Sequence, residues 1–217
     1  MASAGGGFRR GLLTGCLAAL SAAFPVRAQS SGDPLPAGDP ITNDGVVRAS
    51  AVVDSVLLDG LAHDRVVAAG DFASYLMARL GVAPIPADLR FRVVPDTAVL
   101  RLTGRVADLP PEAVREIGPI IAFLDPETRL DALVALSREN PRAYRFRLTE
   151  VLIGGTRVPD DILQMVMTDV GRRYPALSRT GRDLFVEVPA GATIGLVPGG
   201  VRLVAPPAPG PPPAARE

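Results

Sequence analysis

Apolar and polar positions along the chain predict short helices and paired strands in alternation. The valine-rich segments 46–53 and 65–69 are typical of strands. Segment 71–81 has apolar residues at helical spacing, with Asp71 in position to cap its start and Gly81 in position to end it. We therefore expect two strands followed by a helix, whose apolar stripe consists of Phe72, Tyr75, Leu76 and Leu80.

The middle of the chain predicts two hairpins that are separated by a second helix. Segments 90–94 and 98–106 form the first hairpin. Residues 110–124 carry apolar side chains at helical spacing. Segments 129–137 and 143–153 form the second hairpin, and the last of these shows the clearest alternation in the chain.

One more helix and three strands are predicted after Gly155. Pro159 stands at the first turn of the helix, and Asp160 and Asp161 follow where the helix dipole favours negative charge. Pro175 stops the helix. Its buried face is expected to consist of Ile162, Leu163, Val166, Met167 and Val170. The strands follow at 183–188, 193–197 and 201–204.

These elements together indicate the α+β class. Short links between neighbouring strands favour antiparallel pairing. We therefore predict a twisted antiparallel sheet with about three helices packed against it, built from helix-plus-hairpin units in succession.

The first 28 residues have the three parts of a cleavable signal peptide. Arg9 and Arg10 provide the positive start, and the apolar run that follows, 11–24, is too short to cross a bilayer as a helix. We predict cleavage between Ala28 and Gln29. The mature protein is then expected outside the cytoplasm, either periplasmic or secreted.

Cys16, the only cysteine, allows an alternative. The segment from Leu13 to Cys16 looks like a lipobox, which would leave Cys16 lipidated and the protein anchored to a membrane. Five residues separate Arg10 from Cys16, and the apolar run continues for eight residues beyond it, which favours simple cleavage. A retained leader that acts as an anchor is a third alternative.

Polar or proline-rich segments flank the expected single domain, 45–204. Residues 29–44 are rich in proline, glycine and aspartate and predict a flexible spacer. Residues 205–217 consist mostly of proline and alanine, so they predict a disordered tail. The tail prolines could also bind an aromatic groove on a partner protein.

The charge of the chain argues against one class of partner. The 217 residues include 23 arginines, no lysine and 23 acidic residues. Loss of the leader removes three arginines and no acid, so the net charge falls from 0 to about −3. Nucleic-acid binding needs a concentrated positive field, so we expect no nucleic-acid partner.

Catalytic and metal-binding motifs are sparse. His63 is the only histidine and lies next to Asp64, but neighbours in sequence seldom face each other productively. No Gly-x-Ser-x-Gly motif is present, and the one cysteine would be lost with the leader. We therefore predict no enzyme activity, no cofactor and no metal site.

Carboxylates remain the best candidates for hydrolytic chemistry. Asp160 and Asp161 have a structural explanation at a helix start, and Asp125-Pro126-Glu127 looks like a turn. Glu150 is the least expected, because alternation places it on the apolar side of its strand. It either lies near the strand end or pairs with an arginine. The candidate pairs are Asp160 with Asp161, Asp125 with Glu127, and Asp59 with Asp64.

Arginines alternate along two of the expected strands, at positions 90, 92, 145 and 147. They could form a basic outer face for lipid headgroups. An ordinary solvated sheet face is the simpler explanation.

A family resemblance rests on the order of turns and strands. Segment 151–159 reads Val-Leu-Ile-Gly-Gly-Thr-Arg-Val-Pro and runs into the helix, and a strand ending in Pro189 and a short hairpin at 194–203 close the domain. This arrangement, over most of 65–204, is similar to exported bacterial domains of the LmeA-like phospholipid-binding group, which are related in form to tubular lipid-binding domains. The resemblance implies a curved sheet around a helix, an apolar crevice for acyl chains and no catalytic residues.

The resemblance also implies wall residues for such a crevice, with an ordinary closed core as the alternative. The candidate wall consists of Tyr144, Phe146, Leu148, Ile162, Val166 and Val170. We therefore expect an exported, non-catalytic domain that binds a lipid or other apolar ligand in the cell envelope, with transient membrane contact. The alternative is an envelope interaction or scaffold module without a small-molecule ligand, and an enzyme that uses carboxylates such as Glu150 is a third hypothesis.

Overall fold

The computed structural model describes residues 35–61, 63–109, 111, 114 and 123–206. The chain divides into two units, 1–31 and 32–217, and every described residue belongs to the second. The helices and the largely antiparallel strands of this part confirm the predicted α+β class. The expected signal peptide, most of the expected helix at 110–124 and the tail from 207 onwards lie outside the described residues.

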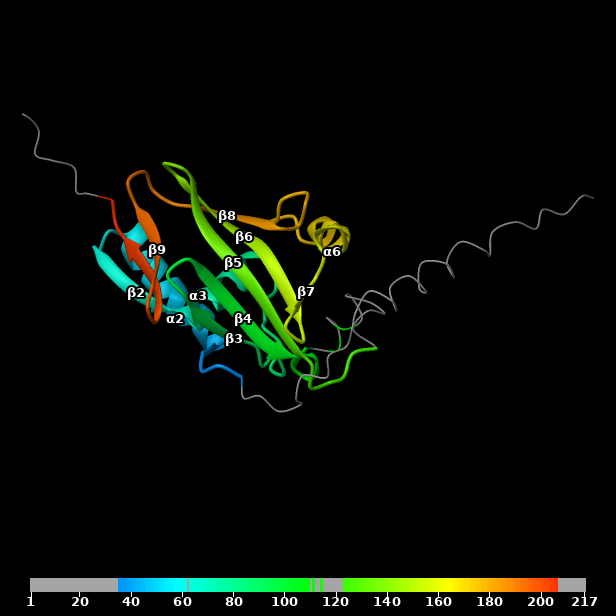
Figure 1. Ribbon diagram of the computed structural model, residues 1–217. Helices are drawn as coiled ribbons and strands as arrows, with labels where there is room; N and C mark the ends of the chain where they lie inside the picture. Colours follow the sequence, from blue (N-terminus) through cyan, green and yellow to red (C-terminus); the bar gives the residue numbers. More distant parts are fainter. Residues whose placement is uncertain (1–34, 62, 110, 112–113, 115–122, 207–217) are drawn as a thin grey trace, which may run out of the picture. The chain divides into compact units, whose positions relative to one another are not determined.

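The strands are divided between two antiparallel sheets (Figure 1). In the large sheet, β8 (Asp183–Glu187) pairs with β6, and the remaining strands follow the order β1 (Asp39–Pro40), β3 (Arg92–Pro95), β4 (Val99–Arg105), β5 (Arg129–Asn140), β6 (Ala143–Ile153) and β7 (Thr156–Arg157). The small sheet has the order β2 (Asp64–Ala68), β10 (Gly200–Val204) and β9 (Thr193–Val197). Strand β2, which comes early in the sequence, thus pairs with β10 of the last hairpin, β9–β10.

Both hairpins predicted for the middle of the chain are confirmed. β3 pairs with β4, and the N–H of Asp96 donates to the carbonyl of Val99 at 2.8 Å in the turn. β5 and β6 form the longest pairing of the structure. The three strands predicted near the end of the domain are also present as β8, β9 and β10.

Segment 46–53, predicted as a strand, lies instead in helix α2 (Asn43–Val53), which a π-helical turn continues to Leu58. The hydroxyl of Thr42 caps the helix by accepting the N–H of Gly45 at 3.0 Å. Gly45, Ala49 and Val53 are buried at a spacing of four residues. The prediction was wrong because burial of one helical face outweighs the strand preference of valine.

Helix α3 (Ala69–Arg79) begins two residues before the predicted cap, Asp71. Asp71 lies in the first turn, where its carboxylate accepts the guanidinium of Arg48 from α2 at 2.7 Å. The predicted end is confirmed, since Gly81 has a φ of +87°. The two helices approach closely at Gly45, where a Cβ would lie 2.8 Å from the Ser74 hydroxyl.

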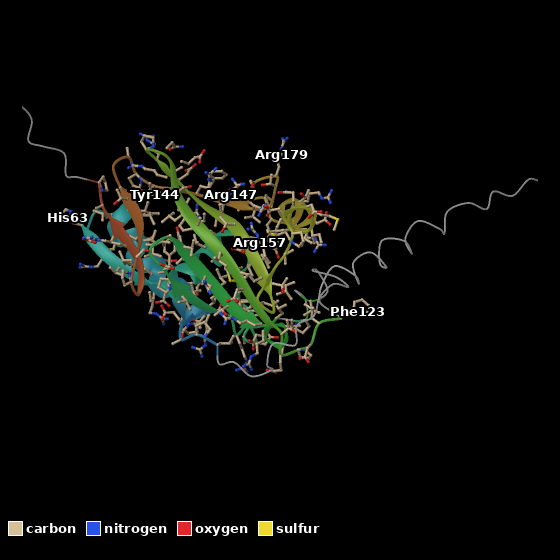
Figure 2. The ribbon with its side chains drawn as sticks, in the orientation of Figure 1. His63, Phe123, Tyr144, Arg147, Arg157 and Arg179 are labelled. Carbon is tan, nitrogen blue, oxygen red and sulfur yellow. The ribbon has the colours of Figure 1, made fainter. Side chains whose placement is uncertain are left out.

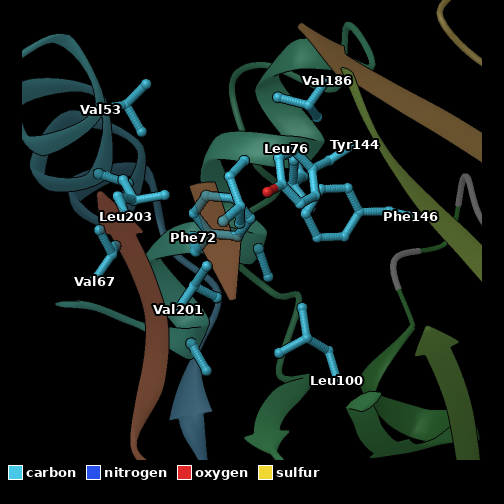
Figure 3. Close-up of a cluster of buried hydrophobic side chains, with 14 of the residues drawn as sticks. Val53, Val67, Phe72, Leu76, Leu100, Tyr144, Phe146, Val186, Val201 and Leu203 are labelled. Atoms are coloured by element: carbon cyan, nitrogen blue, oxygen red, sulfur yellow. The ribbon is translucent and has the colours of Figure 1, made fainter. Parts of the chain in front are cut away.

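The main core joins α2 and α3 to both sheets (Figure 3). Phe72 of α3 lies at its centre, with its ring centroid 5.7 Å from that of Phe146 on β6. Val201 and Leu203 of β10 are fully buried in the same core. Burial of this apolar surface on several elements is what stabilises an arrangement without a disulfide.

The folded part extends beyond the predicted limits of 45 and 204. Residues 39–44, expected in the spacer, include β1, the buried Ile41 and the start of α2. The Asp39 carboxylate accepts the N–H of Ala69 at 3.0 Å, which connects this segment to α3. At the other end, the N–H of Ala205 donates to the carbonyl of His63 at 2.8 Å.

Helix α6 (Asp160–Arg173) is confirmed at its predicted place, but its predicted apolar face is only partly buried. Leu163 is its one buried residue. The helix lies against the loop 178–181, where the Gln164 amide donates to the carbonyl of Thr180 at 3.2 Å. Close backbone packing against this loop therefore replaces much of the expected side-chain burial.

Candidate functional site

The six candidate wall residues divide into a closed group and a half-buried group. Tyr144 and Phe146 point from β6 into the main core and are only 5% and 3% exposed (Figure 3). They pack with Phe72, Leu76 and Val186 in that core. Tyr144 and Phe146 therefore belong to a closed core, which was the alternative to a ligand crevice for these two residues.

Leu148 lies on the same face of β6 as Phe146 but is half-buried. The register places Phe146 opposite Leu136 and Leu148 opposite Val134, so all four side chains share the core face of the sheet. The three wall residues on α6, which are Ile162, Val166 and Val170, are also half-buried. The described residues bring only Tyr144 and Phe146 of the six into the main core cluster.

An apolar strip lies on the core face of the large sheet between two clusters of buried residues. The second cluster is built on Val106 and Leu130, with Ile153 packed against it. Between this cluster and the main core lie Ala132, Leu148 and Val151, which are half-buried and belong to neither cluster of the described residues. We call these three residues the aliphatic strip.

A β-bulge moves Glu150 to the other face of the sheet. Leu133 pairs with Glu150 while Val134 pairs with Leu148, so Thr149 is the extra residue. The Thr149 hydroxyl donates to the carbonyl of Leu133 at 3.0 Å. The prediction that Glu150 lies on the apolar face was wrong, because strict alternation ends at this bulge.

Of the two explanations considered for Glu150, a place near the strand end or an arginine partner, the arginine partner is confirmed. The Nε atom of Arg157 lies 3.7 Å from the carboxylate of Glu150, whose side chain is 28% exposed. Figure 2 shows Arg157 near α6, whereas His63 lies at the opposite side of the domain. Glu150 and His63 therefore do not form a catalytic pair.

His63 and Asp64 do not face one another as a catalytic pair either. His63 is exposed, and Asp64 binds the guanidinium of Arg202 on the neighbouring strand β10. The hydrogen bond from Arg202 lowers the pKa of Asp64 below its ordinary value and raises that of Arg202. A carboxylate held in its charged form in this way joins two strands and is a poor general base.

Asp125 and Asp160, two of the other candidate carboxylates, also have structural partners. Asp125 accepts the N–H of Glu127 at 2.8 Å in a turn, as its sequence indicated. Asp160 accepts from Arg182 at 3.3 Å. In the part of the chain that the structure describes, no three histidine, cysteine, aspartate or glutamate side chains form a group that could hold a metal ion.

The face of the large sheet opposite the core is rich in arginine, and we call it the arginine face. Most of its guanidiniums form ion pairs with carboxylates. Arg129 pairs with Asp131 at 2.9 Å, and Arg105 pairs with Glu127 at 2.8 Å. The strand register assigns to this face Arg92, Arg101, Arg105, Arg129, Arg145, Arg147 and Arg157. Arg145 and Arg147 are paired with Glu139 and Asp183, as expected for a solvated face.

A depression of about 750 Å³ lies where the segment 35–43, the segment 85–90 and the strands β3 and β4 meet. Three arginines line it, Arg90, Arg92 and Arg105, together with one carboxylate, Asp108. A second depression, of about 430 Å³, is lined by Arg101 and Arg129. The first depression could not be predicted from the sequence, because its residues come from segments more than 60 positions apart, although the alternation of Arg90 and Arg92 was a partial signal.

Comparison of the chain with family models, with curated proteins and with solved structures finds no match. The resemblance to the LmeA-like group therefore stays a prediction. Among the described residues, no helix is both long and apolar enough to cross a membrane.

Proposed function

We propose that this chain is an exported, non-catalytic domain that binds a lipid or another apolar ligand in the cell envelope. The observation that carries the proposal is the aliphatic strip. Ala132, Leu148 and Val151 continue the apolar face of the large sheet beyond the closed core, yet they stay half-buried. Partly exposed aliphatic surface between two closed clusters is a favourable surface for an acyl chain.

Helix α6 gives further support to this proposal. Ile162, Val166 and Val170 keep part of their surface exposed, and Met165 is 63% exposed. Flexible aliphatic side chains and methionine adapt well to ligands of variable shape. Of the carboxylates considered for catalysis, Glu150 and Asp160 are by contrast paired with arginines, and Asp125 accepts a backbone N–H.

The experiment is native mass spectrometry of the protein purified gently from the envelope of its own host. We expect an adduct that extracts into organic solvent and that matches a lipid. Leu148→Gln on the strip and Val166→Gln on α6 should each reduce the adduct, because a polar amide at either place removes apolar contact and is costly to desolvate. Leu61→Gln is the matched control, since Leu61 is 81% exposed elsewhere in the chain.

A second candidate function is an interaction or scaffold module of the envelope. It is favoured by the closed packing of Tyr144 and Phe146 and by large apolar side chains after α2, where Leu58 is 72% exposed. A clean mass without adduct, combined with no lipid uptake from vesicles, would support this module and contradict the lipid proposal. Deletion of 207–217 then tests whether a partner protein binds the tail.

A further inference from the structure

The depression beside α2 combines positive charge with apolar walls. Arg90, Arg92 and Arg105 line it, and Asp108 is the single carboxylate among its lining residues. Its apolar lining includes Leu35, Ile85 and Leu89. The volume of about 750 Å³ falls in the range typical of small-molecule sites.

Two of the three guanidiniums have no carboxylate partner among the described residues. Arg105 is neutralised by Glu127 at 2.8 Å. Arg92 donates only to the uncharged carbonyl of Gly38, at 3.0 Å, and the guanidinium of Arg90 has no partner in the described part of the chain. The carboxylate of Asp108 accepts the backbone N–H of Arg105 at 2.8 Å, so it is already engaged at the end of β4.

The rim of the depression is held in place by a pair of hydrogen bonds between distant segments. The Asn43 side chain donates to the carbonyl of Ile85 at 2.9 Å and accepts the N–H of Ile85 at 2.8 Å. This double contact fixes the segment before β3 against the start of α2. A site that is already formed loses less entropy when a ligand binds.

We propose that this depression binds the anionic group of a small ligand, a phosphate or a carboxylate. The planar guanidinium matches both groups with two parallel hydrogen bonds, and charge-assisted bonds of this kind are the strongest available to a side chain. The second depression is a weaker candidate, because Arg129 is already bound to Asp131. This inference goes beyond the proposed function and does not depend on the aliphatic strip.

The test is isothermal titration calorimetry of the full chain, with inorganic phosphate and, separately, dihexanoyl phosphatidic acid below its micellar concentration. The double variant Arg90→Gln/Arg92→Gln should bind both probes about tenfold or more weakly, because the neutral amides cannot replace the charge-assisted hydrogen bonds of the two guanidiniums. Both side chains are exposed, so the variant should fold, which circular dichroism checks. Arg90→Lys/Arg92→Lys keeps the charge and should lose less affinity.

The matched control is Arg142→Gln/Arg179→Gln, which removes the same charge from two exposed arginines elsewhere (Arg179 is marked in Figure 2). We expect it to change the affinity by less than about twofold, since screened charges at a distance contribute little.

Tighter binding of the phosphatidic acid, with phosphate competing, would identify a headgroup site. Equal binding of both probes would identify a site for a free phosphate compound. No binding to the folded wild-type chain, or an equal loss in the control, would overturn the inference.

Discussion

Thr103 and Asp131 are buried polar residues on the face of the large sheet where arginines predominate. They lie opposite one another on β4 and β5. Asp131 is 5% exposed and accepts a hydrogen bond from Nη2 of Arg129 at 2.9 Å, while Nε of the same guanidinium lies 2.9 Å from its other carboxylate oxygen. The Thr103 hydroxyl is fully buried and has no hydrogen-bond partner among the described residues. At the scale of single residues, one buried polar group is therefore satisfied and its neighbour is not.

Replacement of Thr103 by the isosteric valine should leave the free energy of unfolding unchanged or raise it by up to about 1 kcal/mol, because an unsatisfied hydroxyl is removed. Ser74→Ala is the comparison, because the Ser74 hydroxyl donates to the Gly70 carbonyl at 2.7 Å and accepts the Thr42 N–H at 2.9 Å. It should lower the stability by about 1–3 kcal/mol. Urea unfolding measures both, and a larger loss for Thr103→Val than for Ser74→Ala would contradict the assignment.

At the scale of elements, a local irregularity of the backbone, such as a β-bulge, decides which face of a sheet the following side chains occupy. The bulge at Thr149 reverses the alternation of β6, so Glu150 reaches Arg157 on the arginine face. Helix α6 shows a second such event, since it is held by the loop that contains Gly181. The bulge therefore determines that Glu150 lies on the arginine face, and the loop 178–181 contacts α6 closely through its backbone.

Gly181→Ala should lower the free energy of unfolding by about 2–5 kcal/mol, from left-handed strain together with overpacking. Gly181 has a φ of +71°, and a Cβ there would overlap the carbonyl of Met167 on α6. The control is Gly199→Ala, where φ is +86° but the space around a Cβ is empty, so only strain of about 1–2 kcal/mol is expected. Thermal or urea unfolding compares the two, and equal losses would show that α6 does not pack against this glycine.

At the scale of the whole described domain, the small sheet connects residues that are distant in sequence. β10 pairs with β2 over five residues, from Gly200 with Ala68 to Val204 with Asp64. Val201 and Leu203 from β10 also complete the main core. The domain is therefore expected to fold only after its last strand is available.

A chain that ends at residue 206 should keep its fold, because it keeps every contact described for β9 and β10. A chain that ends at residue 199 loses β10, and with it two fully buried side chains and the centre of the small sheet. We expect it to be unfolded or aggregated, since loss of buried aliphatic side chains alone costs about 2–5 kcal/mol each. Circular dichroism with urea titration distinguishes the outcomes, and a cooperative transition in the shorter chain would contradict this role of β10.

Much of the fold was predictable where the pattern was local. The β3–β4, β5–β6 and β9–β10 hairpins, as well as α3 and α6, follow from alternation, helical spacing and turn residues. Helix α2 was not predictable from its valines, because its stability depends on a face buried against α3. For the candidate wall, the alternation correctly placed Tyr144, Phe146 and Leu148 on one face of the sheet. It could not show which of these side chains are closed in the core and which stay partly exposed.

The sequence by itself determined the α+β class, most element positions and the shortage of catalytic motifs, because these depend on neighbours along the chain. Only the tertiary structure decided that the strands divide into two sheets and that Glu150 faces the arginines. It also decided that Arg90, Arg92 and Arg105 meet in one depression. The physical reason is that burial and charge balance depend on residues that are far apart in sequence, and only the packed chain brings them together.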